Sequence, residues 1–161
     1  MCDAAKIIPK AVFFCAQVLA ASNLPWELDV ALLRRLEKRV LVPLPDPAAR
    51  ADMLAKFLDG RVSDDADLES YAQNTDGYSG SDLRLLCKEA AMRPVRRLVV
   101  ELEAMESAGG GAPVADSKVA TLMDGHRVSH SDVVASLECT KPSAKLFADK
   151  YVRWNADFGS S

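Results

Sequence analysis

The stretch LAASNLPWELDVALLRRLEKRVLVPLPDP, residues 19–47, decides the fold. It joins two short apolar runs, VLAAS at 18–22 and VLVPLP at 40–45, through the segment DVALLRRLEK at 29–38, which has helical spacing. Asn23 ends the first run and prolines interrupt the second. Two apolar runs joined by a short helical segment predict neighbouring strands of a mostly parallel, buried sheet.

Helical signals dominate the chain beyond these runs. Asp46 is a good N-cap with Pro47 at the first helical position, and Gly60 predicts the end of that helix. A long helical stretch is predicted over 81–107, where Pro94 should introduce a kink or a break. The region after residue 45 is therefore expected to be all-α.

The last predicted helix starts near Pro142 and carries a stripe of aromatic side chains. They recur at i, i+4, i+7 and i+11, which places them on one helical face. We expect this face to pack against the core, and a partner-binding surface is the alternative. The four residues are Phe147, Tyr151, Trp154 and Phe158.

Composition argues against several classes of protein. A chain of 161 residues with 49% hydrophobic content can build one domain of ordinary size. A net charge of -3 provides no global basic field, so nucleic-acid binding is not indicated. The four cysteines are scattered, and His126 and His130 lack the acidic or thiol partners of a metal site. No run is long enough to span a bilayer as a helix.

Residues 1–17 are left without an assigned fold. Within the apolar stretch AVFFCAQVLAA, at 11–21, two interpretations compete. It has the look of a short signal-peptide core, and it also reads as a buried strand that runs into the polar segment after it.

Three segments of the chain resemble one family. ASNLPWELDVALLRRLEKRVLVPLPDP, at 21–47, resembles the second region of homology of AAA ATPases, and within them the microtubule-severing and vacuolar-sorting group. DGYSGSDLRLLCKEAAMRPVRR, at 76–97, resembles the lid of that group, and TKPSAKLFADKYVRWNADFGS, at 140–160, resembles its C-terminal helix. The motifs LPWELD and RRLEKR are most similar to those of the catalytic chain of katanin and of its paralogues.

The resemblance implies a fold and its divisions. Residues 18–45 would be the last strands of an α/β core of the AAA+ P-loop NTPase type, carrying sensor 1 and the arginine fingers. Residues 46–125 would form an all-α AAA lid, and residues 126–161 a C-terminal helical segment.

The resemblance also implies roles for five residues. Asn23 matches the sensor-1 position, between the γ-phosphate and the attacking water. Arg34 and Arg35 match the arginine fingers, whose planar guanidinium groups stabilise phosphate charge on the neighbouring protomer's nucleotide. Gly80 and Ser81 match the sensor-2 turn, where a backbone without a side chain can approach the adenine and ribose.

Each of these positions has a plainer interpretation. Asn23 could simply end a strand, as asparagine often does. The two arginines could be a solvated basic helix end. Ser79 or Ser81 could be an ordinary helix N-cap, which is compatible with a nucleotide-binding role for the same turn.

Two motifs of ATP hydrolysis do not occur in the sequence. There is no GxxxxGK[ST], and no apolar run ends in the Asp-Glu pair that holds magnesium. We therefore expect ATP to be the cofactor of the parent enzyme, with Mg²⁺ bound only through residues that this chain lacks. The isolated chain is expected to be inactive.

The function implied by the resemblance is that of a katanin-like AAA ATPase, a cytoplasmic, cytoskeletal homo-hexamer that severs microtubules by acting on tubulin. Two alternatives stay open. The chain could be a non-catalytic module that docks on intact AAA protomers, or a fragment of a vacuolar-sorting-type ATPase that disassembles membrane-remodelling filaments. LLRRLEKR favours the katanin-like proteins, because the rival usually carries RRRFEKR.

Overall fold

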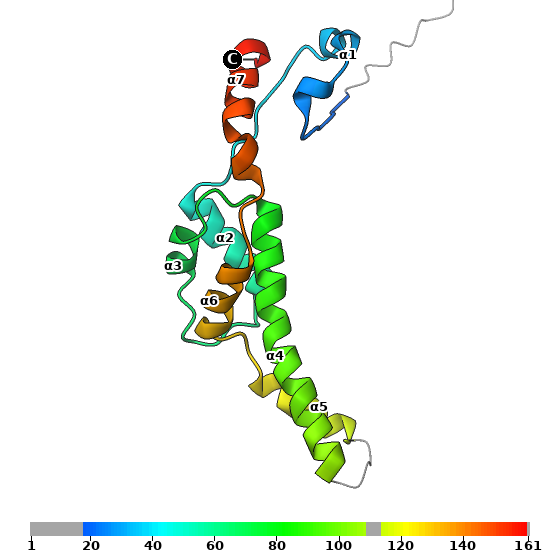
Figure 1. The fold of residues 1–161 in the computed structure, drawn as a ribbon, viewed down its shortest axis with the longest axis vertical. Coiled ribbons are helices and arrows are strands. Elements are labelled where there is room, and N and C mark those ends of the chain that lie inside the picture. The colour runs from blue at the N-terminus through cyan, green and yellow to red at the C-terminus, as the bar shows by residue number, and fades with distance from the viewer. Residues whose placement is uncertain (1–17, 109–113, 161) are drawn as a thin grey trace, which may run out of the picture. The chain divides into compact units, whose positions relative to one another are not determined.

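Helices form the regular structure of this chain, in a computed structural model that describes residues 18–108 and 114–160 (Figure 1). The chain divides into two compact units, Met1–Glu37 and Lys38–Ser161. Each unit is described by itself. In chain order the elements are η1 (Pro25–Glu27), α1 (Val30–Arg35), α2 (Pro47–Leu58), α3 (Leu68–Gln73), α4 (Gly80–Ala108), α5 (Asp116–Gly125), α6 (His130–Cys139), η2 (Ala144–Phe147) and α7 (Ala148–Phe158).

The first unit contains the short helix α1, which confirms the helical segment expected between the two apolar runs. Asp29 caps it, because its side chain accepts a hydrogen bond from the backbone N–H of Ala31 at 2.6 Å. The helix ends after Arg35, where Leu36 donates its N–H back to the carbonyl of Leu32.

The two apolar runs at 18–22 and 40–45 are not strands, so this part of the expectation is wrong. Within the described residues no strand forms, and the β-bridge found there is an isolated parallel pair between Val62 and Val128. An extended apolar run becomes a strand only where a neighbouring strand completes the hydrogen-bond ladder. Val40 and Val42 are instead 79% and 85% exposed.

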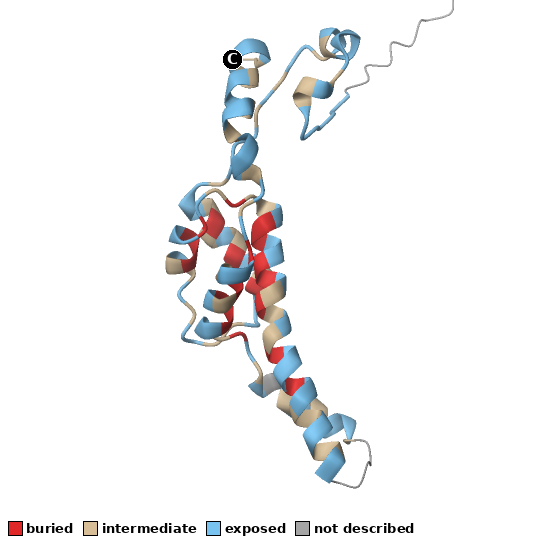
Figure 2. Cartoon of the chain, viewed as in Figure 1, coloured by how far each residue is buried: buried red, intermediate tan, exposed pale blue. Residues whose placement is uncertain are grey.

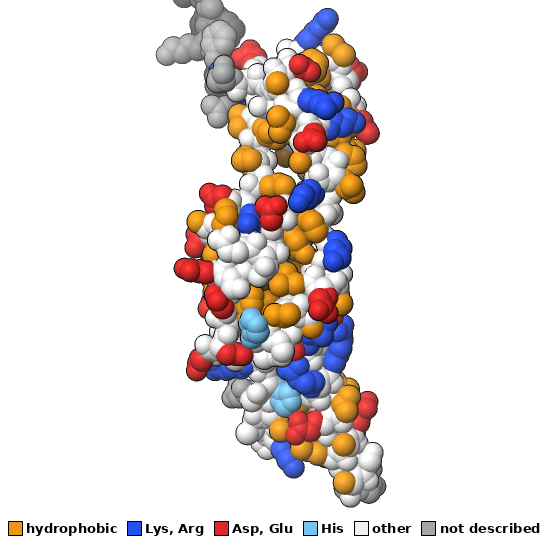
Figure 3. Space-filling view, turned by 60° about the vertical axis from the view of Figure 1, so that its left-hand side comes forward, with side chains coloured by type: hydrophobic (Ala, Val, Ile, Leu, Met, Phe, Trp, Pro, Cys, Tyr) orange, Lys and Arg blue, Asp and Glu red, His pale blue; other side chains and the backbone are white. Residues whose placement is uncertain are grey.

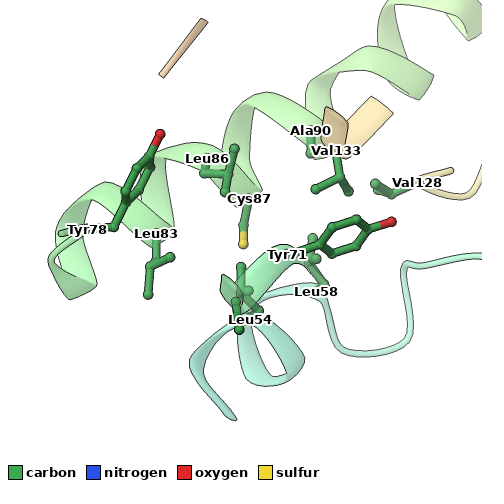
Figure 4. Close-up of a cluster of buried hydrophobic side chains, with 11 residues drawn as sticks. Leu54, Leu58, Tyr71, Tyr78, Leu83, Leu86, Cys87, Ala90, Val128 and Val133 are labelled. Atoms are coloured by element: carbon green, nitrogen blue, oxygen red, sulfur yellow. The ribbon is translucent and has the colours of Figure 1, made fainter. Parts of the chain in front are cut away.

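The core of the second unit lies between α2, α3, the first half of α4, and α6, as the buried residues in Figure 2 show. Leu54 of α2 and Leu83 and Leu86 of α4 are fully buried. Figure 4 shows these side chains converging with Tyr71 of α3 and with the thiol of Cys87. The all-helical lid predicted for this region is confirmed.

Local capping explains where the core helices begin. Asp46 accepts a hydrogen bond from the N–H of Ala49 at 2.7 Å and Pro47 opens α2, as expected. Gly60, with φ of +66°, adopts the left-handed conformation that lets the chain turn away after α2. The helix α3 is capped by Asp67, whose side chain accepts a hydrogen bond from the N–H of Ser70 at 3.0 Å.

Helix α4 runs for 29 residues and continues through Pro94 without a break. A proline in a helix removes one backbone hydrogen bond. Pro94 is buried, and Leu98 one turn further along is also buried, so packing holds the helix together at this point. Beyond it, α5 contacts α4, and His126 lies 3.3 Å from the Glu101 carboxylate.

Helix α7 contributes no buried residue, so the expectation that its aromatic stripe packs into the core is wrong. Trp154 and Phe158 contact each other, with ring centroids 5.5 Å apart, and Phe158 is 46% exposed. The residues that follow α7 are held instead by hydrogen bonds to Arg39. Ser160 donates its backbone N–H to the Arg39 carbonyl at 2.9 Å. Arg39 in turn donates a side-chain hydrogen bond to the Phe158 carbonyl.

Acidic and basic side chains are both present on the face of the second unit drawn in Figure 3. None of the helices within 18–108 and 114–160 has the length and apolar character needed to cross a membrane. In the same ranges, no group of three or more His, Cys, Asp or Glu residues is arranged to hold a metal ion.

A two-point ion pair joins α4 to α6. Arg97 donates from Nη1 and Nη2 to the two carboxylate oxygens of Asp132 at 2.5 and 2.9 Å. The Asp132 side chain is only 4% exposed, and its carboxylate also completes the capping box of α6 with Ser129. The Arg97 guanidinium, helped by Ser129, lowers the pKa of Asp132 to about 2, although burial acts in the opposite direction.

Acid should therefore weaken the second unit in a defined range. Because the folded pKa of Asp132 lies below its ordinary value near 4, its stabilisation is complete above pH 4 and is lost as the pH falls from about 4 to 2. We expect about 2 kcal/mol of unfolding free energy to be lost in this way. Urea titrations between pH 2 and 7 measure it. Asp132→Asn should lower stability at pH 7 and flatten the curve below pH 4, whereas an unchanged curve would contradict the assignment.

Candidate functional site

Arg34 and Arg35 lie on the last turn of α1, and both side chains are exposed. Arg35 donates from Nη1 to the carbonyl of Ala31 at 2.8 Å, which orients its guanidinium along the helix. The two arginines line an open depression together with Asp29, Val30 and Ala31. The structure thus brings the two predicted finger residues together at a surface where they can reach anionic oxygens.

Asn23 lies in a bend that precedes η1, and it is exposed. It does not end a strand, because none forms within the described residues, so the strand-end placement is wrong. The adjacent Ser22 accepts a hydrogen bond from the N–H of Leu24 at 3.1 Å. Asn23 is not among the residues that line the depression beside α1.

Gly80 and Ser81 occupy the first two positions of α4, in the second unit. Ser79 caps this helix: its N–H and hydroxyl donate to Asp82 Oδ2 at 2.9 and 2.8 Å, and the Asp82 N–H donates to Ser79 Oγ at 3.2 Å. The plainer interpretation, a helix N-cap, therefore holds at Ser79. The exposed side chain of Ser81 is left pointing away from the core.

The packing of this chain does not require a glycine at position 80. A Cβ built there would meet only the sulfur of Met53, at an ordinary contact distance of 3.7 Å. The positive-φ glycines within the described residues are Gly60 and Gly77, so Gly80 needs no special backbone freedom. If position 80 requires a residue without a side chain, the requirement comes from a ligand or another chain that approaches the backbone there.

Asp82 connects the start of α4 to the segment that leads into η2. Ser143 donates its hydroxyl to Asp82 Oδ1 at 2.7 Å and its N–H to Oδ2 at 3.3 Å. Asp82 is 7% exposed. Burial alone would raise the pKa of this carboxyl, but the hydrogen bonds from Ser143 and Ser79 outweigh burial and leave the pKa below its ordinary value. The ionised carboxylate therefore joins two segments that are distant in sequence.

Three further contacts fix the turn before α4 against the same segment. The hydroxyl of Tyr78 donates to the carbonyl of Thr140 at 2.7 Å, in a buried position. Lys145 lies 3.5 Å from the Asp76 carboxylate, in an exposed ion pair. The Lys145 side chain also covers Gly77, whose φ of +77° suits only glycine well. The turn and the segment over 140–145 thus form one packed element.

Sequence reasoning found the two positions at the start of α4 but missed the residues that hold them. The Ser79-x-x-Asp82 spacing repeats the Ser129-x-x-Asp132 capping-box pattern, so a local signal for Asp82 was present. Ser143 gave no such signal, because it reaches Asp82 across 61 positions of sequence.

Replacing Ser143 with alanine should loosen the start of α4. The change removes one charge-assisted hydrogen bond from a buried carboxylate, which we expect to cost about 1–2 kcal/mol of unfolding free energy. Hydrogen exchange at the amides of Gly80 to Leu83 should become faster. Ser117→Ala, at an exposed position of α5, is the matched control and should change neither quantity. Equal protection in both variants would mean that Ser143 does not support the turn.

The comparisons with known proteins define the class of this fold. Residues 65–106, which contain α3 and nearly all of α4, match the AAA+ lid domain. Among solved structures, one titled "Structural Basis for Katanin Self-Assembly" has 32% sequence identity and a TM-score of 0.69, covering 84% of this chain and 45% of its own. The FIGL-1 AAA domain in complex with ADP has 31% identity and a TM-score of 0.68, over 87% of this chain and 44% of its own.

Proteins that are similar in sequence define the group of AAA proteins more closely. The chain is 47% identical over 150 residues to the A-like 2 form of the katanin p60 ATPase-containing subunit of Xenopus tropicalis, covering 89% of this chain and 26% of the relative. It is 39% identical over 128 residues to "Meiotic spindle formation protein mei-1" of Caenorhabditis elegans, covering 79% of this chain and 25% of the relative. The chain belongs to the katanin-like group of AAA ATPases, and it spans about a quarter of the length of these relatives.

Proposed function

We propose that this chain is the lid-bearing part of a katanin-like protein that uses ATP hydrolysis to sever microtubules. In this proposal residues 46–125 are the lid and residues 126–161 the C-terminal helical segment. The observation that carries it is the start of α4, where a firmly held turn presents a glycine that the chain's own packing does not need. The katanin relative that is named as ATPase-containing supports the same conclusion.

In the proposed site, the adenine and ribose of ATP lie against Gly80 and Ser81. A helix N-terminus presents unpaired N–H groups and a partial positive charge, which favour polar and anionic ligands. The Asp82 carboxylate is held by hydrogen bonds from Ser79 and Ser143 and therefore does not depend on a ligand for its donors. The FIGL-1 AAA domain, a structural neighbour, is described as a complex with ADP, and this supports nucleotide as the ligand.

Arg34 and Arg35 are proposed to act on a nucleotide bound by a neighbouring protomer. Hydrolysis of ATP builds negative charge on the transferred phosphoryl group, and two exposed guanidinium groups on one helix turn can stabilise that charge. Asn23 is proposed to orient the attacking water. This division of labour requires an oligomer of AAA protomers, a hexamer in our proposal. A solved structure that is similar to this chain is titled "Structural Basis for Katanin Self-Assembly", and this supports such an assembly.

The proposed substrate is tubulin in microtubules, and the proposed location is the cytoskeleton. The support comes from the names of the relatives, which include katanin proteins and a meiotic spindle formation protein. Magnesium would be held by residues that do not occur in this sequence, which lacks GxxxxGK[ST] and the acidic pair.

The test uses the native protein. An antibody against the tail KLFADKYVRWNADFGSS, residues 145–161, isolates it from the source organism together with whatever it is bound to. We expect the isolated material to hydrolyse ATP and to shorten fluorescent microtubules only when ATP is present. Material that contains the chain in quantity but shows neither activity would overturn the proposal.

A further inference from the structure

Helix α4 has two apolar faces on opposite sides. One face packs into the core through Leu83, Leu86, Ala90 and Leu98. The opposite face also carries large apolar side chains, yet within the described residues α2, α3, α5 and α6 leave it open to solvent. Its members and their exposed fractions are Leu85 at 56%, Met92 at 39%, Val95 at 42% and Val99 at 46%. A helix that is apolar on both sides indicates a second packing partner.

The spacing of these four residues is that of a coiled-coil seam. Leu85, Met92 and Val99 are seven residues apart, and Val95 lies between the last two at the alternate position of the heptad. The half-buried Leu102 continues the same series. We call Leu85, Met92, Val95, Val99 and Leu102 the α4 seam. A seam of this kind fits another helix with the same repeat, rather than a flat protein surface.

The α4 seam is complementary to itself when two copies run antiparallel. In that arrangement the two heptad positions face each other in every layer. Met92 then lies opposite Val95 of a second copy, and Leu85 lies opposite Leu102. The series is apolar throughout except for Lys88, which faces Val99 and can carry its ammonium group past the seam into water.

Charge supports the antiparallel choice. Glu89 and Arg96 flank the seam on one side, and within each helix they already form an ion pair at 2.6 Å. In an antiparallel pair, Arg96 of each copy lies beside Glu89 of the other, so two opposite-charge contacts form symmetrically. In a parallel pair Arg96 would lie beside Ala91 of the other copy, and Glu89 would lie beside Arg84, whose guanidinium already lies over the Phe57 ring of its own chain. A parallel arrangement therefore gives Arg96 no opposite charge across the seam, whereas the antiparallel arrangement pairs both Glu89 and Arg96.

We propose that the α4 seam is a self-association surface, on which a second copy of this chain packs through its own α4 in antiparallel orientation. The contact does not depend on nucleotide and is separate from the ring of the proposed function. One helix pair buries little area, and interfaces below about 1,200 Å² are usually weak and transient. The expected dissociation constant is therefore micromolar, on the order of 10⁻⁶ to 10⁻⁴ M.

The first test is sedimentation velocity of the full chain over a range of concentrations. Met92→Asp and Val95→Asp each place a carboxylate in the seam, and we expect each to weaken the dimer at least about tenfold. Val100→Asp is the matched control: Val100 is 65% exposed on the same helix but outside the seam, so its dimer should persist. Circular dichroism is used to check that each variant is folded. A chain that stays monomeric at all concentrations, or a dimer indifferent to Met92→Asp, overturns the proposal.

A charge-reversal cycle tests the orientation. Glu89→Arg alone and Arg96→Glu alone each place like charges opposite one another in the antiparallel dimer, and each should weaken it severalfold at low salt. The double variant Glu89→Arg with Arg96→Glu should recover the original association. Failure of the double variant to recover, with both single variants weakened, would overturn the antiparallel register.

Discussion

Replacing Arg35 with alanine should lower ATP turnover of the native assembly by about a thousandfold while nucleotide binding stays nearly unchanged. The reason is that an arginine finger stabilises charge that exists mainly in the transition state of hydrolysis, so its loss raises the barrier by about 4 kcal/mol without weakening the ground state. Arg35 is exposed at the end of α1 and is held along the helix by its bond to Ala31, which suits this role. Steady-state turnover and binding of a fluorescent nucleotide measure the two quantities separately.

Two further variants sharpen that experiment. Arg35→Lys keeps the charge but loses the planar fork, so we expect most of the turnover to be lost. Arg61→Ala removes an arginine from an exposed turn after α2 and should leave turnover unchanged. Normal turnover in Arg35→Ala would refute the finger assignment. A loss of nucleotide binding in the same variant would instead indicate a structural role for Arg35.

Replacing Arg50 with alanine should destabilise the second unit by about 3 kcal/mol. Arg50 is 5% exposed, and it donates from Nε to the carbonyl of Ala72 at 3.0 Å and from Nη1 to the carbonyl of Pro45 at 2.8 Å. It therefore joins the start of α2 to the end of α3. The alanine variant leaves these carbonyls without their donor and removes the packing of the long side chain. Urea denaturation followed by circular dichroism measures the change.

Lys56→Ala is the matched control for Arg50. It removes a positive charge from an exposed position of the same helix, and we expect a change within about 0.5 kcal/mol. An Arg50→Ala protein as stable as the control would mean that the two buried hydrogen bonds contribute little. Arg50→Lys, which keeps one donor but not the fork, should fall between the two.

The helices could be predicted because their signals are local. Asp46 with Pro47, and Ser129 with Asp132, fix two helix starts through contacts within four residues, and these are readable in the sequence. Ser63 shows the opposite case, a contact that is not local. Its hydroxyl donates to the Val128 carbonyl at 3.0 Å, a partner 65 positions away that no local pattern reveals.

Elements that depend on distant partners could not be predicted in the same way. An apolar run such as 40–45 has strand character in sequence, but a strand requires a ladder, and its backbone finds none within the described residues. Trp154 and Phe158 of α7 contact each other, but Phe147 of the expected stripe lies in η2, and α2, α3, α4 and α6 already fill the core. The start of a helix near Gly80 and Ser81 could be predicted from the sequence, whereas the contact of Ser143 with Asp82 required the fold.

The unbroken course of α4 gives it the mechanics of a lever. At 1.5 Å per residue, its 29 residues form a rod about 43 Å long. The first half of α4 packs in the core of the second unit. In the described part of the chain, the second half is contacted by α5 and by His126, which follows α5. A tilt of about 5° at the first turn would therefore move the far end of the helix by about 4 Å. Any event that shifts the first turn would be amplified, in rigid-body fashion, toward the tip of the arm that α4 and α5 build together.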